Sequence, residues 1–264
     1  MKNVSLLLKG SGGDVDRIHE PEVLQHSSLV FDGAGNARTR SPYGFFTTFP
    51  LLPAAAVAAG SEKILITAGT GIEVASRSAK GGVNMASAAA DNDQAMLIGI
   101  ATTDSVLPIA AKSKVRFATR VSITTITSVI FAAGFDQTFT NLLGETAAGE
   151  GAQFLFDPAD ELQLVTEQAA AGIVAANFIC ATKVAGVDSY RNTGVKVVAG
   201  VDYELAIEVG GDLISRYYIN GVLVGTAATA HVAASVGVAL GVQNGSAATR
   251  DFDCRQASFE RVIG

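Results

Sequence analysis

Residues 201–226 read VDYELAIEVGGDLISRYYINGVLVGT, and this stretch decides the fold. In its first third, apolar residues alternate with Glu204 and Glu208, and this period of two predicts a strand with one buried face. Asn220 and Gly221 then supply two residues that tolerate positive φ, as a type I′ hairpin requires. The stretch therefore predicts three antiparallel strands joined by tight turns, a β-meander.

From residue 62 onward, short apolar runs alternate with turns rich in glycine, asparagine and aspartate. These runs predict strands at 63–67, 71–75, 83–87, 94–100, 114–123, 129–135, 152–156, 162–166, 177–182, 235–243 and 251–262. Residues 129–135 do not alternate, which predicts a strand buried on both faces, whereas 91–93 and 186–193 predict a turn and a loop. The spacing of crossover helices is missing between the strands, so the pattern favours an all-β, antiparallel two-sheet sandwich over a parallel α/β fold.

Residues 1–61 have a different character. Four prolines and many turn-forming residues interrupt every apolar cluster, so this segment lacks a core of its own. Its aromatic side chains are nevertheless costly to leave in water: Phe31, Tyr43, Phe45, Phe46 and Phe49. We therefore expect an extended N-terminal arm over 1–61, which lies either on its own sandwich at 62–264 or on a neighbouring subunit.

A family resemblance accompanies these patterns. The meander, together with residues 236–250, VGVALGVQNGSAATR, resembles the closing strands of the concanavalin A-like (laminin-G-like) β-sandwiches of tailed-bacteriophage structural proteins. Asp-Asn-Asp at 91–93 and KVRFATRVSI at 114–123 stand where that family has earlier strands. The resemblance covers residues 82–264 and implies a jelly roll with a structural role in a virion.

Composition restricts the class of protein. Hydrophobic residues make up 48% of the 264 and charged residues 17%, which is a low charged fraction for a free monomer and favours a subunit of an assembly. The net charge of −6 and the lack of a Lys/Arg cluster argue against nucleic-acid binding. No apolar run reaches the ~20 residues of a membrane helix, and Lys9 ends the first run too early for a signal peptide. We therefore expect no membrane partner, and synthesis in the cytoplasm of a host cell.

Carboxylates on the meander are the candidates for catalysis. Retaining β-glucanases of this fold carry Glu-x-Asp-x-Glu on one strand face, and their two catalytic carboxyl groups lie about 5 Å apart. This chain has Glu204, Ala206 and Glu208 at that spacing, and the two glutamates would be ~13 Å apart along a strand. Neither Gly-x-Ser-x-Gly nor a cysteine close to a histidine occurs in the sequence. We therefore expect that the protein is not an enzyme.

Metal and thiol chemistry have few candidates. Oxygen ligands at 91–93 and 157–161 suit calcium, but neither group has the spacing of a calcium loop. The three histidines have no partners at zinc-ligand spacing: His19, His26 and His231. We therefore expect no metal and no cofactor. Cys180 and Cys254 fall in predicted strands, which favours small buried thiols, with a disulfide as the alternative.

Two functions remain. The first, implied by the resemblance, is a capsid decoration (cement) protein on the virion surface, which binds the major capsid protein and forms a homotrimer. The aromatic residues of the arm would make the capsid or subunit contacts, or pack on the sandwich instead. The second is a carbohydrate-binding module of a phage tail fibre or a lectin, with Tyr217 or Tyr218 as the sugar contact. Strand geometry directs one of these two tyrosines inward.

Overall fold

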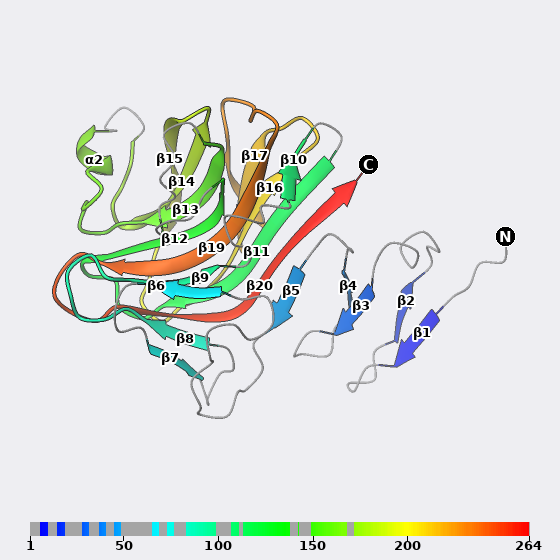
Figure 1. Ribbon diagram of the computed structural model, residues 1–264, viewed down its shortest axis with the longest axis horizontal. Coiled ribbons are helices and arrows are strands. Elements are labelled where there is room, and N and C mark those ends of the chain that lie inside the picture. The colour runs from blue at the N-terminus through cyan, green and yellow to red at the C-terminus, as the bar shows by residue number, and fades with distance from the viewer. Residues whose placement is uncertain are drawn as a thin grey trace.

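In the part of the chain that the structure describes, two antiparallel sheets of eight strands each pack as a sandwich (Figure 1). The computed structural model describes residues 83–98, 107–110, 113–137, 142, 149–167 and 172–263, and seven short strands between residues 6 and 76. Every strand pairing is antiparallel, and the described helix is one turn, α2 (Leu164–Glu167). The expected all-β jelly-roll sandwich is therefore confirmed.

One sheet, here called the β11 sheet, has the order β18-β17-β16-β11-β20-β8-β7, and β5 also pairs with β20. Its strands are β5 (Phe45–Thr48), β7 (Glu73–Ser76), β8 (Val83–Ala86), β11 (Ser113–Ile123), β16 (Asp202–Val209), β17 (Ser215–Ile219), β18 (Val222–Thr226) and β20 (Asp251–Ile263). The C-terminal strand β20 lies beside β11 over the whole length of β11, so the end of the chain forms the middle of this sheet.

The facing sheet, here called the β12 sheet, has the order β15-β14-β13-β12-β19-β9-β6, and β10 also pairs with β19. Its strands are β6 (Leu65–Ala68), β9 (Gln94–Ile98), β10 (Leu107–Ile109), β12 (Val129–Asp136), β13 (Gly151–Phe156), β14 (Asn177–Val184), β15 (Val187–Lys196) and β19 (Ala234–Asn244). Neighbours such as β12 and β19 are distant in sequence, so the sheet is held together mainly by long-range pairing.

The amino-terminal region contributes two small hairpins and one strand to the described structure. Two-stranded sheets form from β1 (Leu6–Lys9) with β2 (Val15–Ile18), and from β3 (Ser28–Phe31) with β4 (Ala37–Arg40). By contrast, β5 belongs to the β11 sheet. The division of the chain into 1–61 and 62–264 stays a prediction.

The meander at 202–226 is confirmed as β16, β17 and β18. Asn220 and Gly221 have φ values of 51° and 78°, the positive pair that the two-residue turn requires. The Asn220 side chain accepts a hydrogen bond from the Glu204 amide at 2.9 Å, which ties the turn back to β16. The hydrophobic pattern and the turn chemistry therefore agree.

Aromatic rings fill the space between the two sheets. Phe131 of β12 contacts Phe178 and Phe252 edge to face, with ring centroids 6.4 and 5.8 Å apart, and Phe178 contacts Tyr203 at 5.1 Å. These rings come from both sheets, so the core joins the two layers. Edge-to-face pairs add about 0.5–1.5 kcal/mol each beyond the apolar area that they bury.

The strand β12 is buried along all eight of its residues, which confirms the expected double burial at 129–135. One face of β12 lies in the main core, and on the other face Ala132 packs in a second cluster with Leu155, Leu164 and Ile173. This second cluster contains residues from around α2, so that segment covers the outer face of the β12 sheet.

Two local predictions were wrong. The expected strand at 162–166 instead contains most of the turn α2. Asp160, which lies four residues before α2, accepts hydrogen bonds from the Val165 amide at 2.8 Å and the Thr166 hydroxyl at 3.1 Å, so its side chain satisfies a donor of the helical turn. The expected loop at 186–193 is mostly strand β15, because the turn is shorter than predicted. Only Ala185 and Gly186, with φ values of 49° and 79°, connect β14 to β15.

The two cysteines are free and buried, as the sequence favours. Burial raises the pKa of the Cys180 thiol to about 12, so this thiol stays protonated at neutral pH. Among the residues that the structure describes, no helix has the length and apolar character needed to cross a membrane.

Candidate functional site

The outer face of the β11 sheet carries the candidate site. Along β16, Tyr203, Leu205 and Ile207 point into the core, so Glu204 and Glu208 lie on the opposite, outer face. Glu204 is exposed and Glu208 is half-buried, as the alternation in the sequence predicts. This face is therefore polar and charged, whereas the inner face is apolar.

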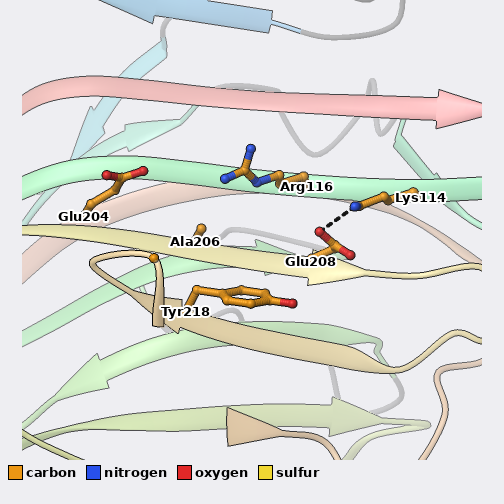
Figure 2. Close-up of a pocket in the computed structure, with 7 residues that line it drawn as sticks. Lys114, Arg116, Glu204, Ala206, Glu208 and Tyr218 are labelled. Atoms are coloured by element: carbon orange, nitrogen blue, oxygen red, sulfur yellow. Dashed lines mark ion pairs between the residues drawn. The ribbon is translucent and has the colours of Figure 1, made fainter. Parts of the chain in front are cut away.

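A groove of about 350 Å³ lies on this outer face (Figure 2). Its lining comes from β11, β16, β17 and the turn after β17: Lys114, Arg116, Glu204, Ala206, Glu208, Tyr218 and Gly221. Its volume falls at the small end of the roughly 300–1,000 Å³ range of ligand pockets. The groove therefore suits a small ligand, or a short part of a longer one.

Small residues form the floor of the groove, and an aromatic ring stands beside them. Ala206 pairs in register with Ala118 of β11 on one side and with Tyr218 of β17 on the other. Ala206 and Gly221 are the small residues of the lining, and Figure 2 shows the Tyr218 ring near Ala206. The same row continues in register to Ser258 of β20 and Phe46 of β5.

Charges of both signs line the groove. Lys114 Nζ lies 2.7 Å from Glu208 Oε2, and because both groups are partly exposed, this ion pair contributes little to stability. Arg116 projects from β11 between Lys114 and the position of Glu204, as Figure 2 shows. The two basic and two acidic side chains balance, so the groove has no net formal charge.

The structure separates the two candidate tyrosines. Tyr218 lines the groove, whereas Tyr217 is fully buried in the core. The Tyr217 hydroxyl donates to the Ala181 carbonyl at 2.6 Å and lies 2.7 Å from the Thr182 hydroxyl, and burial raises its pKa. Tyr217 cannot touch a ligand at the surface, so Tyr218 is the remaining sugar-contact candidate of the pair.

The five aromatic residues of the arm are placed only in part. Phe31 ends β3, and Phe45 and Phe46 begin β5, which pairs with β20. Tyr43 and Phe49 lie outside the described residues. The role of these residues in capsid or subunit contact stays a prediction.

A hydrogen-bonded Ser-His-Glu chain, which the sequence did not reveal, lies at one end of the sandwich. Ser215 Oγ is 2.6 Å from His231 Nε2, and His231 Nδ1 is 2.8 Å from Glu150 Oε2. The imidazole of His231 therefore bridges the Ser215 hydroxyl and the Glu150 carboxyl group. Glu150 also accepts the amides of Ala185 at 2.7 Å and Val232 at 3.2 Å.

The Ser215–His231–Glu150 hydrogen bonds connect the same residue types as a catalytic triad, but all three side chains are buried, as in a structural network. Ser215 is 0% exposed, and His231 and Glu150 are each 3% exposed, so no substrate carbonyl reaches the hydroxyl. His231 is the buried residue in a loop whose neighbours at 228–230 and 232–233 are exposed. These hydrogen bonds therefore fix the β18–β19 loop to Glu150, just before β13, and to the start of β17.

The acidic groups considered for calcium have other roles. Asp157 accepts the amides of Glu161 at 3.0 Å and Leu162 at 2.7 Å, and burial raises its pKa. Residues 91–93 form the expected turn, with Asn92 at a φ of 65°. Within the described ranges, no three His, Cys, Asp or Glu side chains are grouped as metal ligands.

Comparisons with known proteins bear on the fold. No family model and no curated protein matches the sequence. Among solved structures, a protein of unknown function from Shewanella oneidensis MR-1 is similar, with a TM-score of 0.57 and 10% identity over 83% of this chain and 87% of that one. The carbohydrate recognition domain of Emp47p is similar with a TM-score of 0.52 and 12% identity, over 82% and 94% of the chains.

The Crh5 transglycosylase is a third similar structure, with a TM-score of 0.50 and 12% identity over 83% of this chain and 84% of that one. At such low identity these likenesses show the fold alone. They confirm the concanavalin A-like part of the resemblance, whereas its bacteriophage part stays a prediction. The chain is thus a concanavalin A-like jelly roll with a small, charge-balanced groove on the outer face of one sheet.

Proposed function

We propose that the protein binds carbohydrate in the groove on the β11 sheet. The observation that carries the proposal is the Tyr218 ring beside a floor of small residues, with carboxylates and basic groups around it. A sugar ring presents an apolar face that packs on an aromatic ring, and hydroxyls that both donate and accept hydrogen bonds. Glu204 accepts such bonds and Arg116 donates them.

The size, charge and fold of the site agree with this proposal. A groove of about 350 Å³ holds a short glycan segment, and its balanced charges favour a neutral sugar over a polyanion. The fold is shared with the carbohydrate recognition domain of Emp47p, which supports carbohydrate as the ligand class.

We propose binding without turnover. Glu204 and Glu208 are separated by ~13 Å along β16, well beyond the about 5 Å of a retaining pair, and Ala206 stands between them. Glu208 also lies 2.7 Å from Lys114 Nζ, so this carboxylate already has an ion-pair partner. The site therefore recognises a glycan and leaves its bonds intact.

Replacing Tyr218 with alanine is expected to weaken glycan binding about ten-fold, the equivalent of ~1.4 kcal/mol, because the stacking surface is lost. A glycan array would identify the ligand, and calorimetry would then compare the two proteins. Tyr190→Ala is the matched control, because Tyr190 is a half-buried tyrosine on the β12 sheet, away from the groove. Equal glycan affinities of Tyr218→Ala and Tyr190→Ala, or a glycan array without any hit, would contradict the proposal. Release of reducing sugar from a bound glycan would contradict binding without turnover.

The second candidate function is capsid decoration. We propose it because β5, from the amino-terminal region, already joins the β11 sheet, and because only 17% of residues are charged, as suits a subunit of an assembly. In this role the protein sits on the virion surface as a homotrimer bound to the major capsid protein. The mechanism is mechanical, since binding to the assembled shell stabilises that shell.

Deleting residues 1–44, which leaves β5 in place, is expected to abolish binding to phage heads while the sandwich stays folded. Co-sedimentation with heads of the tailed phage that encodes the chain would measure this, with circular dichroism as the check on folding. Tyr218→Ala is the control that should still co-sediment. Undiminished binding of the shortened chain would contradict the arm's role, and no binding of the full chain would dismiss decoration.

A further inference from the structure

The strand β20 pairs with one long strand on one edge and with two short strands, one after the other, on its other edge. On one side, β11 accompanies it from Phe252 to Ile263. On the other side two short strands follow each other: β8 pairs with Asp251–Cys254, and β5 pairs with Gln256–Phe259. On that side, residues Gln256–Phe259 of β20 therefore pair with a four-residue strand from the amino-terminal region.

The origin of β5 sets it apart from the other strands of the sheet. Among the described strands before residue 65, β5 is the one that joins the sandwich, because β1 to β4 pair only with each other. Since β5 ends at Thr48 and β6 begins at Leu65, 16 residues connect them. A chain of that length spans up to roughly 50 Å when extended, about the width of a neighbouring domain.

The edge of β20 that pairs with β5 can pair equally with the β5 of another copy of the protein. Four pairs define the register, from Thr48 with Gln256 to Phe45 with Phe259. If β5 leaves, those four residues of β20 present an open edge, which is a template for adding a strand. A second copy offers the same strand in the same register, so the pairing itself has the same energy within a chain and between chains.

We propose that β5 is exchanged between copies of this protein, so that the β5 of one copy pairs with the β20 of its neighbour and links the sandwiches into a closed oligomer. The 16-residue connection has the necessary reach, and exchange adds contacts between sandwiches at no loss of strand pairing. The low charged fraction of 17% agrees with additional surface buried between copies. This inference is independent of glycan binding, because the groove is built without β5.

The test places one cysteine on β5 of one variant and another on β20 of a second variant, so that a disulfide between them can form only between chains. Full-length Thr48→Cys and Gln256→Cys variants are unfolded together, refolded together and oxidised with a mild thiol oxidant. Directly opposed residues in antiparallel strands lie within disulfide range. The expected result is a disulfide-linked dimer of the two variants on a non-reducing gel, with a cross-linked peptide pair that spans positions 48 and 256. Cys180 and Cys254 stay in place because both are buried.

Two controls make every outcome decisive. Thr48→Cys refolded with Thr229→Cys, an exposed position outside the pair, measures random cross-linking and should give at least five-fold less dimer. A single chain with both Thr48→Cys and Gln256→Cys should give a ladder of linked oligomers. A product that is only an internally linked monomer, with no excess dimer in the mixture, would overturn the exchange. A double variant that forms no disulfide would overturn it as well, because β5 would then not pair with β20.

Discussion

Replacing His231 with alanine is expected to lower the free energy of unfolding by about 3 kcal/mol, because buried polar groups lose their hydrogen-bond partner. His231 fills the space between Glu150 and Ser215, and both of these groups are almost fully buried. Without the imidazole, the Glu150 carboxylate keeps its two amide donors but loses its charge-assisted partner inside the sandwich. Urea unfolding followed by fluorescence or circular dichroism would measure the loss.

A graded series tests whether the buried carboxylate is the cause. Ser215→Ala removes one hydrogen bond and should cost only about 1 kcal/mol, since no charge is left without a partner. Thr229→Ala, at an exposed position of the same loop, should leave stability unchanged. If His231→Ala cost no more than Ser215→Ala, then the Glu150–His231 contact would not anchor the loop as described.

Gly134→Ala is expected to cost about 4 kcal/mol or more, enough to prevent accumulation of folded protein. Gly134 has a φ of +153°, and a Cβ there would lie 2.2 Å from the Ala152 carbonyl oxygen and 2.8 Å from Ile207 Cδ1. The first obstacle is backbone of the paired strand β13, which cannot move without breaking the sheet. The second lies on β16, behind the groove floor. Soluble yield and thermal unfolding would measure the effect.

Gly200→Ala is the matched control for this substitution. Its φ of +71° is also positive, but nothing lies within 4 Å of the position that a Cβ would take. This change carries the strain of a positive φ without a collision, so it should cost only about 1 kcal/mol. Similar losses at the two positions would show that backbone conformation, and not the close approach of β13, accounts for the effect.

Local pattern was enough to predict most of the fold. The alternation before Val209 and the Asn220-Gly221 turn are short-range signals, and the structure reproduces both. The uninterrupted apolar run at 129–135 likewise predicted double burial. The helical turn α2 was missed because the side chain of Asp160, which lies before the turn, bonds to Val165 and Thr166, and these bonds outweigh the weak strand pattern of 162–166.

The site was harder to predict, because it depends on register between distant strands. The alternation placed Glu204 and Glu208 on the outer face, but only pairing with β11 and β17 brings Arg116 and Tyr218 beside them. The Ser-His-Glu chain joins positions 81 and 16 residues apart in sequence, with no motif at any of them. The only sequence signal for the Ser-His-Glu hydrogen bonds was a single histidine in the alanine-rich segment 227–234.

The position of β20 constrains how the protein is made. β11 ends at Ile123 and its neighbour β20 begins at Asp251, so 127 residues lie between these two paired strands. During synthesis β11 therefore lacks this neighbour until β20 has also been made, and the sheet is incomplete over that interval. Because the pairing joins strands so distant in sequence, closure of the sandwich is expected to be slow, and the incomplete sheet is the state most exposed to aggregation.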